Sequence, residues 1–138
     1  MQSMKPTKVA LAGLVFLGLV NLARGSIHFF APDGGLTSIA GLDLSTERAT
    51  ILFFIGAVGG GQIAFGLLDL LVAWRHRNMV LPLLVIHLIE MAFGLFLFFV
   101  WRPLPVVVPG QVGAVFSFVV FGLITVREFL HERRDVEG

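Results

Sequence analysis

Residues 79–101 read MVLPLLVIHLIEMAFGLFLFFVW, and Glu90 at their centre is the only carboxylate, lysine or arginine among them. A helix needs about 20 apolar residues to cross the hydrocarbon core of a bilayer. This stretch is long enough and apolar enough to do so. It therefore predicts a transmembrane helix with one acidic side chain near the middle of the membrane.

Three further apolar segments have the same character. They lie near residues 9–30, 47–75 and 106–130, and basic, aromatic or proline residues mark their ends. The composition agrees, since 57% of the 138 residues are hydrophobic, 14% are charged and the mean hydropathy is +0.92. The four segments use nearly the whole length. We therefore expect a single transmembrane domain over residues 1–138, an all-α four-helix bundle.

The connections predict how the helices follow one another. Residues 31–46 form the one long loop, with Ser45 placed to cap the second helix. The link after Trp74 is so short that the second and third helices must be antiparallel neighbours, and Asn78 is placed to cap the third. Three prolines between residues 102 and 109 stop a helix there. The expected topology is up-down-up-down.

The basic residues predict the orientation. With four spans, the long loop shares its side with three arginines, Arg24, Arg48 and Arg102. The termini share the other side with seven basic residues: Lys5, Lys8, Arg75, Arg77, Arg127, Arg133 and Arg134. Cytoplasmic segments of membrane proteins carry the excess of lysine and arginine. Both termini are thus expected in the cytoplasm, in a multi-pass protein of the inner (plasma) membrane.

Composition also excludes several functions. A net charge of +1, with the basic residues at helix ends, does not favour a nucleic-acid partner. Without cysteine there are no disulfides, thiolate metal ligands or thiol redox reactions. His87 and Glu90 have the three-residue spacing of metal ligands in helical bundles, but such sites need a second pair and further carboxylates. No metal is expected.

Polar side chains inside the apolar segments are the candidates for function. Counting about 1.5 Å per residue from the basic ends places Asn21, Gln62 and Glu90 at one depth, with His87 and Ser117 slightly lower. Unpaired polar groups are costly in lipid, so we expect this layer to face the bundle interior. Arg24 and His28, on the same face of the first helix as Asn21, extend this layer toward the outer side of the membrane. The expected ligand-binding residues are Asn21, Arg24, His28, Gln62, His87, Glu90 and Ser117.

Charged residues near this layer allow more than one interpretation. Arg24 lies one turn outward of Glu90 and is expected to form a buried ion pair with it; alternatively, Arg24 ends a shorter helix and faces the outer headgroups. Asp69 lies near the level of Arg75, where snorkelling predicts an interfacial salt bridge. Glu128 is assigned to the turn where the fourth helix leaves the membrane. Gly56 and Gly60 form a G-x-x-x-G pattern, which favours close helix packing within the bundle or in a dimer.

One stretch supports a resemblance to a known family. Residues 59–77, GGGQIAFGLLDLLVAWRHR, follow a first helix that ends near Arg24 and an outer loop. In this layout the segment resembles the second helix of DoxX-like small bacterial membrane proteins, which have four helices and about this length. The resemblance implies the fold and, in some members, an accessory role in redox systems. Gln62 stands where many members have an acidic residue.

Three classes of function remain open. The first is a protein that binds a lipid, quinone or other amphipathic molecule at the polar layer, or an accessory subunit of a membrane complex. The second is a small proton-coupled transporter or proton pathway, in which Glu90 and His87 exchange protons across a homo-oligomer. The third is a membrane enzyme that modifies a lipid. No nucleophile or cofactor motif supports the third class, so catalytic residues are not assigned and an enzyme is the less favoured reading.

Overall fold

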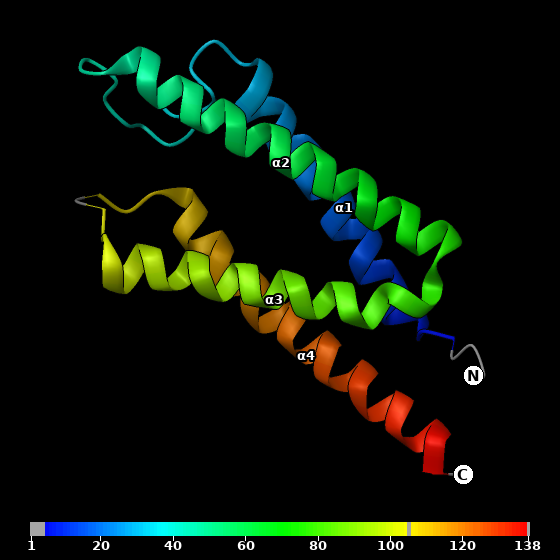
Figure 1. Ribbon diagram of the computed structural model, residues 1–138. Coiled ribbons are helices and arrows are strands. Elements are labelled where there is room, and N and C mark those ends of the chain that lie inside the picture. Colours follow the sequence, from blue (N-terminus) through cyan, green and yellow to red (C-terminus); the bar gives the residue numbers. More distant parts are fainter. Residues whose placement is uncertain (1–4, 105, 138) are drawn as a thin grey trace. The chain divides into compact units, whose positions relative to one another are not determined.

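The computed structural model describes residues 5–104 and 106–137 (Figure 1). Every regular element within these ranges is a helix, which confirms the all-α class. An α-helix satisfies its own backbone donors and acceptors, which is what an apolar segment in lipid requires. The elements are α1 (Lys8–Phe30), α2 (Arg48–Arg75), the 3₁₀ turn η1 (Arg77–Met79), α3 (Val80–Phe96), the π-helical turn η2 (Leu97–Trp101) and α4 (Pro109–Glu137).

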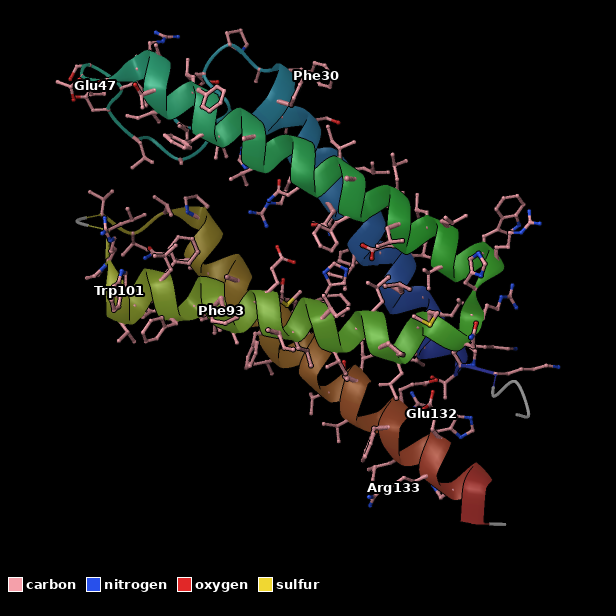
Figure 2. All side chains as sticks on the ribbon, in the orientation of Figure 1. Phe30, Glu47, Phe93, Trp101, Glu132 and Arg133 are labelled. Atoms are coloured by element: carbon pink, nitrogen blue, oxygen red, sulfur yellow. The ribbon has the colours of Figure 1, made fainter. Side chains whose placement is uncertain are left out.

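Four helical stretches in the described ranges are long and apolar enough to cross a membrane, as the sequence predicts. They are Lys8–Phe30, Arg48–Arg75, Arg77–Trp101 and Pro109–Arg134. Large apolar side chains such as Phe53, Phe93 and Val107 are exposed. Figure 2 shows two of these exposed side chains, Phe93 on α3 and Trp101 on η2. Such a surface suits a lipid environment rather than water.

The start of α2 differs from the expected one. Ser45 does not cap this helix, because its amide and hydroxyl both donate to the carboxylate of Asp43, each at 2.8 Å. Glu47 instead precedes the helix with a φ of 51° and accepts the first helical hydrogen bond, from Ile51. The short-range bonds to Asp43 hold Ser45 in the loop and delay the helix to Arg48.

The start of α3 also differs, and the cap expected from Asn78 is wrong. Asn78 lies inside η1, and the residue at the N-cap position is Met79, which makes no side-chain cap hydrogen bond. The Met79 amide donates to the His76 carbonyl at 2.8 Å. The link is so short that a 3₁₀ turn fills it completely, which leaves Asn78 no capping position.

Helix α4 begins at Pro109, later than the expected residue 106, and runs on to Glu137, beyond the expected 130. Proline suits the first helical position because its missing N–H needs no partner there. Gln111 completes the cap, since its Oε1 accepts the Val108 amide at 3.0 Å. At the other end no proline or glycine stops the helix before Glu137.

The chain forms two compact units. The 16–70 unit contains most of α1 and α2 with the loop between them. The 71–138 unit, which also includes residues 1–15, contains the start of α1, the end of α2, and η1, α3, η2 and α4 over the described residues.

In the 16–70 unit, α1 and α2 lie side by side as a hairpin (Figure 1). Their backbones touch at two glycine pairs. A Cβ added to Gly25 would lie 2.7 Å from the Gly59 carbonyl oxygen, and one added to Gly66 would lie 2.7 Å from the Gly18 carbonyl oxygen. Small residues allow this approach in apolar helices. The contact thus uses Gly59 and Gly66, whereas Gly56 has no neighbouring atom within 4 Å of its added Cβ.

The loop between α1 and α2 is ordered by side chains that bind its backbone. The Asp33 carboxylate accepts the amides of Ser38 at 2.6 Å and Gly35 at 3.0 Å. Gly34 and Gly35 have φ of 59° and 75°, values that favour glycine. The hydrogen bonds from Ser38 and Gly35 lower the pKa of Asp33 from 3.8 to about 2, because they stabilise its charged form.

In the 71–138 unit, α3 packs against α4. The start of α1 also contacts α4, because a Cβ on Gly13 would lie 3.4 Å from both Phe121 and Ile124. Glu128 is fully buried in α4, a burial that its expected place in the exit turn did not indicate. It accepts the Thr7 amide at 2.9 Å, and a carboxylate buried in this way needs such partners.

Candidate functional site

Asp69 and Asn21 form the polar centre of the 16–70 unit. Asn21 Nδ2 donates to Asp69 Oδ2 at 3.4 Å, across the contact between α1 and α2. Asp69 is 0% exposed. The expected interfacial salt bridge to Arg75 or Arg77 stays a prediction, because these arginines belong to the other unit. A glycine on the facing helix explains the burial of Asp69. A Cβ on Gly18 would lie 2.9 Å from the Asp69 Cβ, so the missing side chain of Gly18 makes the room for Asp69.

Gln62 lies two helical turns from Asp69 on the same face of α2, with Gly66 between them. Its side-chain oxygen Oε1 is buried and accepts no hydrogen bond from the residues that the structure describes. A buried acceptor without a donor costs about 1 to 3 kcal/mol. An N–H or O–H group brought to Gln62 would recover this free energy.

Two further expected site residues lie toward the loop end of α1. Arg24 is exposed. The Nδ1 of His28 lies 2.7 Å from the Gly34 carbonyl oxygen. A carbonyl only accepts, so Nδ1 carries the proton in this contact. His28 thus ties the end of α1 to the loop, a structural role that the sequence pattern does not indicate.

His87 and Glu90 form a second polar group, in the 71–138 unit. They lie one turn apart on α3, and His87 Nδ1 is 3.3 Å from Glu90 Oε2. The two side chains differ sharply in exposure, with His87 buried at 2% and Glu90 open at 59%. Ser117, on α4 of the same unit, is half-buried. The pair joins a titratable base and a titratable acid within one membrane span.

The expected residues therefore fall into two groups, one in each unit. The polar layer across all four helices and the pair of Arg24 with Glu90 stay predictions, because they join residues of different units. The burial of the Asp69 and Glu128 carboxylates was not predicted from the sequence. Their partners lie 48 and 121 residues away along the chain, so no local pattern reveals them.

In residues 5–104 and 106–137, no three histidine, aspartate or glutamate side chains gather closely enough to hold a metal ion.

No family model matches the chain, and no curated protein or solved structure matches it significantly.

Proposed function

We propose that the chain is a small multi-pass protein of the inner (plasma) membrane that binds an amphipathic molecule, a lipid or a quinone species, at the polar residues of the 16–70 unit. The observation that carries the proposal is the buried Oε1 of Gln62, which accepts no hydrogen bond from the described residues. A buried acceptor without a donor suits a ligand that carries an N–H or O–H group. It favours a lipid with a free hydroxyl, or the hydroxyl of a quinol.

Asn21 and Asp69 add specificity to this binding. Asp69 is held by the Asn21 amide, so the carboxylate keeps a fixed position on the same face as Gln62. A hydroxyl at Gln62 therefore lies on the α2 face that also carries the Asp69 carboxylate, while the tail of the ligand meets the apolar side chains of the membrane spans.

Copurification tests the proposal. The full chain and its Gln62→Leu variant are purified in mild detergent, and the organic extracts are compared by mass spectrometry. We expect an amphiphile in the extract of the unchanged chain and about tenfold less in the variant, as the loss of one buried hydrogen bond implies. Ser26→Ala, an exposed polar change on α1, is the control. An equal amount of amphiphile from Gln62→Leu would refute the proposal.

A second candidate function is a proton pathway, and the contact between His87 and Glu90 favours it. Both groups can exchange protons, and intramembrane acids commonly serve this purpose. In proteoliposomes carrying the full chain, Glu90→Gln would then abolish a pH-driven proton flux, whereas Ser26→Ala would not. A flux that is unchanged in Glu90→Gln excludes this function.

We further infer an up-down-up-down arrangement with both termini in the cytoplasm. Two observations support it. Only a short link through η1 separates α2 from α3, which favours the same membrane side for the end of α2 and the start of α3. The contact of Thr7 with Glu128 brings the start of α1 to the end of α4. The excess of basic residues near these ends assigns them to the cytoplasm.

A further inference from the structure

An apolar pocket of about 710 Å³ lies in the 71–138 unit, where η2, the following link and the start of α4 meet. Its volume is in the range of small-molecule sites, about 300 to 1,000 Å³. Gln111 is the one polar residue among those that line it. The others are Phe98, Phe99, Pro103, Leu104, Val107, Val112, Val115, Phe116 and Val119.

The π-helical turn builds one wall of this pocket. The Arg102 amide donates to the Leu97 carbonyl at 3.0 Å, which closes a wide turn of five residues at the end of α3. Phe98 and Phe99 lie within this turn and contribute their side chains to the wall. Pro103 follows directly and ends the helix. Such turns are frequent at functional sites, because they change which side chains face a neighbouring helix.

Helix α4 builds the opposite wall and gives the pocket its length. Gln111, Val115 and Val119 follow one another at intervals of four residues, so they form a row along one face of α4. The row extends about 12 Å, from the first turn of α4 toward the interior of the span. A long apolar pocket that runs along a helix in this way suits an extended hydrocarbon chain.

An exposed arginine directly precedes Pro103, one of the residues that line the pocket. Arg102 lies between Phe99 and Pro103 in the chain and is exposed. Trp101 beside it is also exposed, and its ring centroid lies 6.2 Å from that of Phe96. Tryptophan and arginine at the end of a span are typical of the headgroup level. Arginine there matches a phosphate in charge and in hydrogen-bonding geometry.

We propose that this pocket binds one anionic phospholipid, with an acyl chain along α4 and the phosphate at Arg102. The proposal shares no residue with the site at Gln62 and does not depend on it. Two features together favour this lipid: the apolar row on α4, and the exposed cation of Arg102 beside Pro103 of the pocket lining. A neutral zwitterionic lipid satisfies only the first of these features.

Native mass spectrometry of the full chain in detergent tests the proposal. The probes are dioleoyl phosphatidylglycerol and dioleoyl phosphatidylcholine, which differ only in the headgroup. We expect one tightly bound phosphatidylglycerol and about tenfold weaker binding of phosphatidylcholine, as one charge-assisted hydrogen bond implies. Val115→Trp fills the pocket and should abolish the binding. Leu123→Trp, an exposed position on α4 outside the pocket, should not change it.

Arg102→Gln provides a second readout that does not depend on filling the pocket. We expect this variant to bind the two lipids with equal affinity, whereas Arg48→Gln, at another exposed arginine, keeps the preference. Gln62→Leu should also keep it, which separates this proposal from the proposed function. Equal binding of both lipids to the unchanged chain, or equal losses from Val115→Trp and Leu123→Trp, would overturn the proposal.

Discussion

The carboxylate of Glu128, near the end of α4, accepts hydrogen bonds from the amide and the hydroxyl of Thr7, the residue that precedes α1. The Thr7 hydroxyl oxygen in turn accepts the Ala10 amide at 3.2 Å. Thr7 is thus an N-cap that is held by a carboxylate from another helix. The negative charge also lies at the positive end of the α1 dipole, where it is stabilising.

A double-mutant cycle should detect this contact. Glu128→Leu leaves the amide and hydroxyl of Thr7 without their acceptor and is expected to cost about 1 to 3 kcal/mol of unfolding free energy. Thr7→Val removes the cap hydroxyl and is expected to cost about 1 kcal/mol. Because both changes break the same contact, the double variant should lose less than the sum. Unfolding in detergent, followed by circular dichroism, measures all three, and additive losses would mean that the two residues do not interact.

Gly25→Ala should destabilise the helical hairpin. Its new methyl group would lie 2.7 Å from the Gly59 carbonyl oxygen and 2.8 Å from the Ile63 amide nitrogen, so the backbones must separate. Overpacking of this kind typically costs about 1 to 3 kcal/mol. Gly61→Ala is the matched control, because nothing lies within 4 Å of an added Cβ there. If both variants unfold at the same temperature, the close glycine contact is not present.

The loop after α1 should respond to acid at an unusually low pH. Asp33 has a pKa of about 2 in the folded chain against its ordinary value of 3.8, so its contribution to stability is complete above pH 3.8. That contribution is lost as the pH falls through about 2. The Ser38 amide reports this change by NMR, because it donates to Asp33. A titration midpoint near the ordinary pKa of 3.8 would show that the hydrogen bonds to Asp33 do not form.

Cysteine labelling should reveal the orientation, and the chain has no native cysteine to interfere. In intact cells, an impermeant maleimide should label Ser45→Cys in the loop and leave Gly138→Cys unlabelled until the membrane is opened. The excess of basic residues near the termini is the reason. The opposite pattern of labelling would reverse the orientation.

The spans were predictable because they depend on local composition. Each apolar segment favours a helix without reference to the rest of the chain. The helix starts after the loop and the links were harder to predict, because a side chain caps a helix only if no other nearby group takes its hydrogen bond. Ser45 and Asn78 both have side chains suitable for capping. Ser45 is instead hydrogen-bonded to Asp43, and Asn78 lies inside the 3₁₀ turn.

The buried polar contacts were least predictable, because they join residues far apart in the sequence. Asp69 is buried where Gly18 leaves room, and neither residue identifies the other from its own surroundings. The polar residues Asn21, Gln62 and His87 were predicted as candidates because any polar group inside an apolar span stands out. The apolar pocket near η2 gave no such signal, since its lining resembles the rest of the span.

The glycine contacts between α1 and α2 restrict which mutations the gene can accept at these positions. Every missense change of one nucleotide in a glycine codon introduces a residue with a Cβ atom. At Gly18, Gly25, Gly59 and Gly66, an added Cβ meets atoms of the facing helix closer than 3.0 Å. No single-nucleotide change that alters the amino acid at these positions therefore preserves the contact, and an evolving lineage must either keep all four glycines or change both helices together.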